Sequence, residues 1–375
     1  TVDTTAPAVS ITQPTDGATV TSSVLTINGS AGTASRDAAT VTVKVYSGSL
    51  PSGTPVNAGS APISAGAWTT NVSGLTNGTY TLQATQSDSS GNLGTSAPVT
   101  VTLGSAYRVT GVSPTSVGQG ALSKTLTISG TGFTSGVTVS FSGTGITPTA
   151  TTVTSGTSLA VTVDVGASAA TGARDVVVGK SGERAATCTG CLTVNAGPKV
   201  TTVVPSAVGQ GAQQATVKLN GSGFVNGASV TFSGTGVTDT VTTTTSTQVT
   251  LAVSVGSSAA TGARDVIVTQ PDGGRTTCIG CLTVNPGPTV TSVSPASIAR
   301  GNNATVTLTG TEFVKGATVA VSGTGVNMGK ITWISKTSMT VVLNVTNKAA
   351  TGPRSITVTN PDFGSGTLTN GLTVT

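Results

Sequence analysis

The chain has 375 residues, of which only 8% are charged and 3% aromatic, whereas Gly fills 50 positions and Thr 77. Ordinary soluble domains carry about 25% charged residues, and both Thr and Val favour strands. The composition therefore predicts an all-β protein. The chain contains no histidine, which excludes histidine-dependent nucleophilic catalysis and histidine metal sites. With no acid–base constellation in the sequence either, we expect a protein that is not an enzyme.

The net charge of +5 is spread thinly along the chain. No stretch clusters Lys and Arg as a nucleic-acid groove would, so nucleic-acid binding is not expected. No run of about 18 apolar residues occurs, so the sequence predicts no membrane span. The opening segment TVDTTAP has the composition of a linker, and we expect the chain to be a mature or excised segment.

Residues 1–104 contain alternating runs that are typical of strands, at 8–12, 24–27, 41–46, 80–84 and 99–103. Trp68 and Tyr80 are interpreted as the core tryptophan and the corner tyrosine of an immunoglobulin-like sandwich. The opening DTTAP and the later DSSGN (88–92) resemble bacterial Ig-like domains found in tandem in surface adhesins. This resemblance implies a bacterial Ig-like domain over residues 1–104.

The rest of the chain consists of three repeats of about 90 residues. The three copies share a proline-containing opening, a Gly-rich segment that ends in Phe, and a late TGxR strand. The clearest copies are VSPTSVGQGA (112–121), VVPSAVGQGA (203–212) and VSPASIARGN (293–302), and TGARDV at 171–176 and 261–266 with TGPRSI at 351–356. Short strands separated by Gly-rich turns predict a β-sandwich in each copy.

The phrasing of these repeats resembles the IPT/TIG family of immunoglobulin-like domains. The Gly-x-x-Phe segment of that family is seen at 130–133 and 221–224, and Phe follows again at 141 and 232; the third copy departs with Glu312 and Val321. The resemblance implies three such domains, at 108–198, 199–288 and 289–375. Together with residues 1–104, we expect four tandem immunoglobulin-like β-sandwiches. Proline-containing joints at 195–198 and 285–288 would stiffen them into a rod of roughly 140 Å at 3.3 Å per residue.

The four cysteines form two CxxC pairs, Cys188/Cys191 and Cys278/Cys281. A redox dithiol would sit at a helix start, and a shared metal site would need both pairs close together, although they belong to separate repeats. We therefore predict two local disulfides. In the third repeat LTNG (368–371) stands at the same place, so the turn forms without sulfur. Structural disulfides indicate an oxidising compartment.

Asp3, Asp88 and Asn92 match acidic positions of bacterial Ig-like domains that bind calcium near a domain junction. Calcium takes six to eight oxygen ligands, and the sequence offers few carboxylates here. The same side chains also suit Asx turns. Both interpretations stand for these residues; the sequence predicts no cofactor apart from this one candidate, a structural calcium ion.

The aromatic residues divide into expected core positions and spare ones. The repeated phenylalanines at 133, 141, 224, 232 and 313 are expected in the cores, which leaves Tyr46, Tyr107, Trp333 and Phe363. Trp333 is the best candidate for a ligand contact, with ordinary packing as the alternative. The Arg-Asp dipeptides at 174–175 and 264–265 are interpreted as surface cross-strand pairs. The FSGTG segments resemble phosphate loops only superficially, because no helix follows them.

These observations favour a non-enzymatic structural protein of the bacterial cell surface, such as an adhesin stalk, S-layer or extracellular fibre. We expect it to act as a spacer and a self-association scaffold, because so few charges weaken the repulsion between molecules. Its expected partners are further copies of itself, other cell-surface proteins or glycans. The alternative is a set of accessory modules, spacer or carbohydrate-binding, of a secreted polysaccharide-degrading enzyme.

Overall fold

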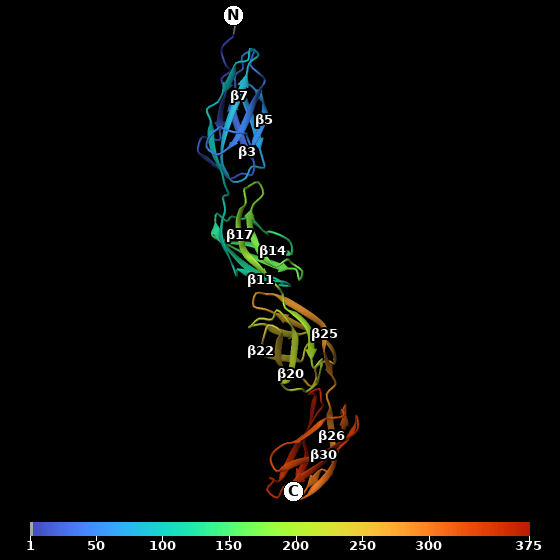
Figure 1. Cartoon of the computed structure of the whole chain (residues 1–375). Coiled ribbons are helices and arrows are strands. Elements are labelled where there is room, and N and C mark those ends of the chain that lie inside the picture. The colour runs from blue at the N-terminus through green and yellow to red at the C-terminus, as the bar shows by residue number, and fades with distance from the viewer. Residues whose placement is uncertain (1–2) are drawn as a thin grey trace. The chain divides into compact units, whose positions relative to one another are not determined.

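The computed structural model describes residues 3–375, and its regular structure is built of β-strands (Figure 1). The residues described contain no helix that could cross a membrane. The all-β class predicted from the abundance of Thr and Val is confirmed. The strands fall into four groups, which we call the first to fourth sandwiches, and the chain is a tandem of immunoglobulin-like β-sandwiches.

The first sandwich contains nine strands in one continuous sheet, in the order β1-β3-β6-β5-β4-β7-β9-β2, with β8 beside β7. Its strands are β1 (Ser10–Gln13), β2 (Ala18–Val20), β3 (Leu25–Ser30), β4 (Thr40–Ser47), β5 (Asn57–Ser64), β6 (Ala67–Val72), β7 (Gly78–Ser87), β8 (Leu93–Thr95) and β9 (Val99–Leu103). The strand β5 connects the two layers: residues 57–62 pair with β4, and residues 63–64 pair with β6. One strand thereby belongs to both faces of the core.

The core of the first sandwich contains both aromatic residues that the sequence placed there. Trp68 is 3% exposed and its indole N–H donates to the Ser30 carbonyl at 3.0 Å. Tyr80 is 6% exposed, and its hydroxyl donates to the Thr76 carbonyl at 3.0 Å. This bond to a carbonyl four residues upstream is the corner geometry that was predicted. Gly29 lies against the Trp68 ring, and a Cβ there would lie 2.2 Å from Cζ2.

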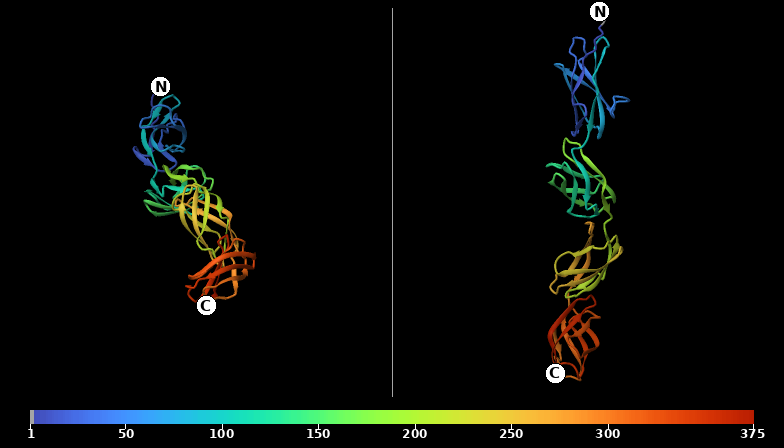
Figure 2. Two further views of the ribbon diagram at one scale, coloured as in Figure 1. Left: turned by 60° about the horizontal axis from the view of Figure 1, so that its bottom comes forward. Right: turned by 90° about the vertical axis from the view of Figure 1, so that its left-hand side faces the viewer.

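The second sandwich follows the same plan as the two after it, and Figure 2 shows the strands of each group as a two-layered bundle. Its strands are β10 (Arg108–Ser113), β11 (Ser116–Gly118), β12 (Lys124–Thr131), β13 (Thr138–Phe141), β14 (Ile146–Ser155), β15 (Ser158–Val165), β16 (Gly172–Gly179) and β17 (Ala186–Asn195).

The third sandwich has two four-stranded sheets, ordered β18-β20-β23-β22 and β19-β25-β24-β21, and the fourth repeats them as β26-β28-β31-β30 and β27-β33-β32-β29. The third contains β18 (Lys199–Val204), β19 (Ala207–Gly209), β20 (Ala215–Ser222), β21 (Ser229–Phe232), β22 (Val237–Thr244), β23 (Gln248–Val255), β24 (Gly262–Thr269) and β25 (Arg275–Asn285). The fourth contains β26 (Thr289–Ser294), β27 (Ser297–Ile298), β28 (Asn303–Thr311), β29 (Thr318–Val321), β30 (Val326–Ser335), β31 (Ser338–Val345), β32 (Gly352–Thr359) and β33 (Ser365–Val374).

Each core is filled by the alternating side chains that the sequence pattern predicts. In β23 every second residue is buried, beginning with Val249, because successive strand side chains point to opposite faces. A short strand pairs parallel with the last strand of its sandwich, β19 with β25 and β27 with β33. The pairings of β20 with β23, β21 with β24, β28 with β31 and β29 with β32 are antiparallel, as in immunoglobulin-like sandwiches.

The repeated Gly-x-x-Phe segment has a packing role. Phe133, Phe224 and Phe313 are at most 3% exposed. A Cβ at Gly221 would lie 2.8 Å from Cζ of Phe224, so only glycine lets the ring cover this strand. One expectation about aromatic residues was wrong: Tyr46 and Tyr107, expected as spare residues, are 8% and 4% exposed. Phe141 and Phe232, expected in the cores, are half-buried, and Phe232 packs against the core of the third sandwich.

The chain divides into two compact units. The first comprises residues 1–115, 125–164 and 172–193, and the second comprises 116–124, 165–171 and 194–375. The second sandwich contributes residues to both units, whereas the third and fourth sandwiches lie wholly in the second.

Candidate functional site

The three residues of the predicted calcium site lie together in the first sandwich. The Asn92 amide donates through Nδ2 to Asp88 Oδ2 at 2.8 Å and to the Asp3 carbonyl at 3.0 Å. Asp88 Oδ1 accepts the backbone N–H groups of Ser90 and Asn92. These are the hydrogen bonds of an Asx turn, in which a side chain stabilises the loop that follows it.

The environment of Asp88 favours its charged form. The side-chain hydrogen bond from Asn92 holds the pKa of Asp88 below its usual range, backbone N–H groups act in the same direction, and burial acts against them. A calcium ion bound here would need Asn92 to turn its amide oxygen toward the metal, because calcium binds oxygen ligands. Calcium binding by Asp3, Asp88 and Asn92 remains a prediction.

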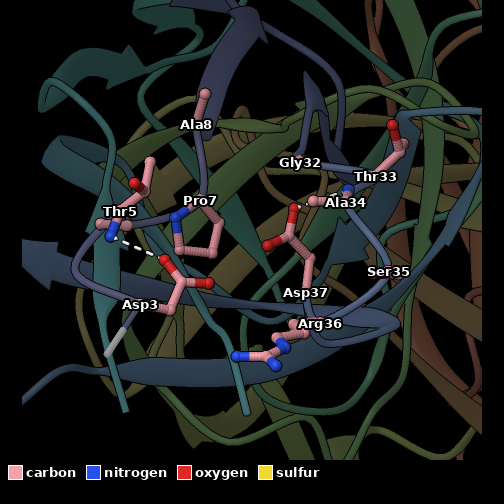
Figure 3. Close-up of a pocket in the computed structure, with 11 residues that line it drawn as sticks. Asp3, Thr5, Pro7, Ala8, Gly32, Thr33, Ala34, Ser35, Arg36 and Asp37 are labelled. Carbon is pink, nitrogen blue, oxygen red and sulfur yellow. Dashed lines mark hydrogen bonds between the residues drawn. The ribbon is translucent and has the colours of Figure 1, made fainter. Parts of the chain in front are cut away.

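Asp3 also lines a pocket of about 510 Å³, and Asp37 in the wall of this pocket was not singled out from the sequence. Figure 3 shows the carboxylates of Asp3 and Asp37 and the guanidinium of Arg36 among the lining side chains. Asp37 Oδ2 accepts the Ala34 N–H at 3.0 Å, and Asp37 forms a β-bridge with Asp88. Asp37 lies in a loop, which is the one sequence signal that could have marked it. Its neighbour in the fold, Asp88, is distant in the sequence, so the sequence does not connect the two residues.

The buried side chain of Gln86 holds the loop of residues 32–38 in place by hydrogen bonds to its backbone. Its Oε1 accepts the Gly32 N–H at 2.8 Å, and its Nε2 donates to the carbonyls of Gly32 and Ala38. Gln86 is 1% exposed, and these three bonds satisfy an amide that would be costly to bury alone. The pocket wall is therefore a fixed part of the first sandwich.

Both cysteine pairs form disulfides, with Cα–Cα distances of 5.7 Å for Cys188–Cys191 and 5.6 Å for Cys278–Cys281. The pairing of β24 with β25 places Cys278 opposite Val266 and Leu282 opposite Arg264, so residues 279–281 form a bulge opposite Asp265. Among the described residues no cysteine is free and no group of three His, Cys, Asp or Glu side chains could hold a metal ion.

The same bulge forms in the fourth sandwich without sulfur, between Leu368 and Leu372 of β33. Gly190, Gly280 and Asn370 occupy the equivalent position with φ of 64°, 64° and 57°, a left-handed conformation that favours Gly and Asn. The equivalence of LTNG with the two CxxC segments, predicted from the sequence, is confirmed. The disulfide therefore closes a bulge that the backbone adopts by itself.

The Arg-Asp dipeptide at 264–265 does not form the surface cross-strand pair expected from the sequence, and for this pair the expectation was wrong. Arg264 is 9% exposed and donates to the carbonyls of Ser233 and Ala260. Asp265 Oδ1 accepts the Gly280 N–H of the cysteine bulge at 2.8 Å. Each residue therefore holds backbone on its own side of the strand, because adjacent strand residues point to opposite faces.

This arrangement also explains the FSGTG segments. At Gly234 a Cβ would lie 1.9 Å from Nη1 of Arg264, and φ is +78°. Gly323 has the same relation to Arg354. The glycine makes room for the guanidinium, so this segment is a packing element of the sandwich.

Trp333 lies on β30, at the edge of its sheet, and is 38% exposed. Its indole N–H donates to the Phe313 carbonyl at 2.9 Å. Ile334 and Met328 of the same strand are 55% and 43% exposed. The ring therefore offers an apolar surface, while its one polar group is used inside the sandwich.

Comparison with protein families identifies two kinds of domain. A model described as "Bacterial Ig domain" matches residues 7–84. A model described as "Quinohemoprotein amine dehydrogenase, alpha subunit domain III" matches residues 106–188 and 287–369. The immunoglobulin-like repeats are thus supported over the first, second and fourth sandwiches. No curated protein matches the chain.

Among solved structures, the chain is similar to the full extracellular region of Plexin A4, at 11% identity and a TM-score of 0.33, over 93% of this chain and 36% of that one. It is also similar to the eight N-terminal Ig domains of Down Syndrome Cell Adhesion Molecule, at 11% identity and a TM-score of 0.28, over 98% of this chain and 48% of that one. A third match is SGBP-B of Bacteroides ovatus, at 18% identity and a TM-score of 0.22, over 77% and 72% of the two chains. The chain spans about a third to a half of the length of the first two.

Proposed function

We propose that this chain is a non-enzymatic structural segment of a bacterial cell-surface protein, of the kind found in adhesin stalks, S-layers or extracellular fibres. The observation that carries the proposal is the threefold repeat of one immunoglobulin-like sandwich after a domain that a bacterial Ig model matches, with its repeated motifs used for packing, as Gly221, Phe224 and Arg264 illustrate. The two local disulfides are typical of proteins in an oxidising, extracellular setting.

The proposed scaffold role includes self-association, for which edge strands offer a route. The strand β14 (Ile146–Ser155) lies at the end of its sheet and carries no charged residue. Proteins that avoid edge-to-edge pairing place charges, Lys above all, on such strands. Exposed threonines such as Thr149 and Thr152 occupy those places here.

Sedimentation velocity of the purified chain over a wide concentration range tests self-association. We expect a sedimentation coefficient that rises with concentration, and a smaller rise in the Thr149→Lys, Thr152→Lys variant. A Thr127→Lys variant, with the charge on the exposed face of the central strand β12, is the matched control and should associate like the parent chain. A strict monomer at the highest concentration contradicts the self-association proposal.

The second candidate function is an accessory module of a secreted polysaccharide-degrading enzyme, and the exposed ring of Trp333 favours it. Aromatic rings stack on apolar ligand surfaces. A pull-down with insoluble polysaccharides would decide: retention of the parent chain that is lost in Trp333→Ala but kept in Phe363→Ala supports this function. Phe363, 40% exposed on a turn of the same sandwich, is the control. No retention of the parent chain rejects it.

A further inference from the structure

The turns between β24 and β25 and between β32 and β33 share a Pro-Asp pair, Pro271-Asp272 and Pro361-Asp362. In each turn one carboxylate oxygen accepts an N–H of its own loop, from Gly274 at 2.9 Å or Gly364 at 3.1 Å. We call these two segments, residues 270–274 and 360–364, the Pro-Asp turns. The other carboxylate oxygen of each turn accepts a hydrogen bond from outside the turn.

An asparagine at the end of an earlier strand donates the hydrogen bond to this second carboxylate oxygen in each turn. Asn195 Nδ2 donates to Asp272 Oδ2 at 2.9 Å, and Asn285 Nδ2 donates to Asp362 Oδ2 at 2.8 Å. The four residues all belong to the second compact unit. Hydrogen bonds to a charged carboxylate are stronger than those between neutral groups.

Backbone bonds repeat the same contact. Gly209 N donates to the Asp362 carbonyl at 3.0 Å, and Ser365 N donates to the Gln210 carbonyl at 3.0 Å. The segment one repeat earlier does the same, with Gly118 N to the Asp272 carbonyl at 3.3 Å and Arg275 N to the Gln119 carbonyl at 2.9 Å. The Gly-Gln-Gly segments at 118–120 and 209–211, each with its asparagine, are named the turn cradles.

Glycine is required where a cradle meets its turn. A Cβ at Gly209 would lie 2.6 Å from Cα of Gly364, and a Cβ at Gly118 would lie 2.4 Å from Cα of Gly274. Gly118 and Gly209 themselves do not have a positive φ, unlike Gly120 and Gly211 two residues further on. The absence of a side chain therefore serves the approach of the Pro-Asp turn and not the conformation of the cradle itself.

The cradle glutamine holds the joint to the next sandwich. Gln210 Oε1 accepts the Gly287 N–H at 3.2 Å, and its Nε2 donates to the Ala259 carbonyl at 2.6 Å. Gln119 makes the same pair of bonds with Gly197 and the Ala169 carbonyl. The amide thus ties the linker between two sandwiches to the loop beside the cradle.

The fourth sandwich differs at all three positions that make a cradle. Ala299 stands in place of Gly118 and Gly209, and Arg300 in place of the glutamine. The final LTVN of β17 and β25 becomes LTVT, so that Thr375 replaces the asparagine. The methyl group of Ala299 occupies the space that a turn would need. The guanidinium of Arg300 has no acceptor for an N–H of a linker, and Thr375 lacks the amide donor of asparagine.

We propose that each turn cradle is a docking site for the Pro-Asp turn of the sandwich that follows it in the chain, and that the fourth sandwich has lost this site. The segment that each cradle binds is a tight turn of five residues, with an aspartate at the third position and a glycine at the fifth. The inference goes beyond the proposed function and holds for any role of the chain.

Hydrogen exchange of the full chain with the Gly209→Ala substitution tests the proposal. The variant gives the third sandwich the residue that the fourth already carries at Ala299. We expect the backbone amides of residue 209 and of Ser365 to exchange about tenfold faster or more. The reason is that the local opening that exposes them breaks fewer hydrogen bonds between cradle and turn than in the parent chain. The amides of the cradle at Gly118 and those between β20 and β23 should keep the exchange rates of the parent chain.

Two further variants keep the test decisive if Gly209→Ala loosens the third sandwich itself. Asn285→Thr removes only the amide donor and should also speed exchange at Ser365, by about tenfold. Ala299→Gly is the matched control and should change no rate in the Pro-Asp turns. Unchanged exchange at Ser365 in both Gly209→Ala and Asn285→Thr would overturn the docking site.

Discussion

Replacing Tyr80 by phenylalanine should lower the free energy of unfolding of the first sandwich by about 1 kcal/mol. The ring is 6% exposed and stays in place, so the change removes only the hydroxyl contacts with Thr76, which are the bond to its carbonyl at 3.0 Å and the bond with its own hydroxyl at 3.1 Å. Because Thr76 is exposed, water can replace the lost donor, which places the cost near the middle of the range for one hydrogen bond. For a domain of about 100 residues, that cost lowers the Tm by roughly 4–8 °C.

Tryptophan fluorescence can follow this sandwich alone, since the chain has only two tryptophans, Trp68 and Trp333. In a Trp333→Phe background, the signal of Trp68 reports unfolding of the first sandwich. Tyr46→Phe is the control, because Tyr46 is 8% exposed and its hydroxyl makes no hydrogen bond to the described residues. Equal midpoints for Tyr80→Phe and Tyr46→Phe would refute the corner interpretation.

The remaining predictions concern the first and third sandwiches. Replacing both Cys278 and Cys281 by serine should cost the third sandwich at most about 2 kcal/mol, the loop entropy of a four-residue ring, and calorimetry should show a retained transition; complete loss of it contradicts the spare role of sulfur. Gly29→Ala should cost about 2 kcal/mol and shift Trp68 emission, because its Cβ would overlap the indole; an unshifted spectrum counts against this packing. The folded pKa of Asp88 is lowered, so its contribution is present above about pH 4 and is lost as pH falls through the folded pKa; exchange at the Asn92 amide should rise there in the parent chain and stay flat in Asp88→Asn. Calcium, if bound by these loops, should raise the Trp68-monitored Tm relative to EDTA; an identical Tm rejects the calcium prediction.

Strands whose side chains alternate strictly could be predicted from the sequence, and β23 and β31 are examples. The strand β5 (Asn57–Ser64) was not predicted, because its residues NAGSAPIS show little alternation. Its conformation depends on pairing with both β4 and β6. A strand specified by its neighbours carries no periodic signal of its own.

The repeated motifs indicated from the sequence which residues the fold depends on, but not which contacts require them. The FSGTG and Arg-Asp segments are separate motifs in the sequence, yet Arg264 packs against Gly234. The GQG segment stood out as a repeat, but its partner Asp362 is about 150 residues away in the chain. Such pairs are brought together by the fold, and only their coordinates connect them.

The cysteine bulge was the site best anticipated from sequence. The equivalence of CIGC with LTNG predicted a local feature that does not depend on sulfur, and Asn370 adopts the same left-handed conformation as Gly280. The bond from Gly280 to Asp265 was not foreseen, because Asp265 lies on the neighbouring strand. The backbone conformation of a short turn depends on the residues of the turn itself, whereas the partner of a side chain across two strands depends on how the strands are aligned.

We propose that the chain is a structural part of a protein displayed outside a bacterial cell. Antibodies raised against the purified chain, applied to intact cells of the source bacterium and to lysed cells, test this proposal most directly. Labelling of intact cells, equal to that after lysis, is the result that the proposal predicts. Labelling that appears only after lysis would contradict it.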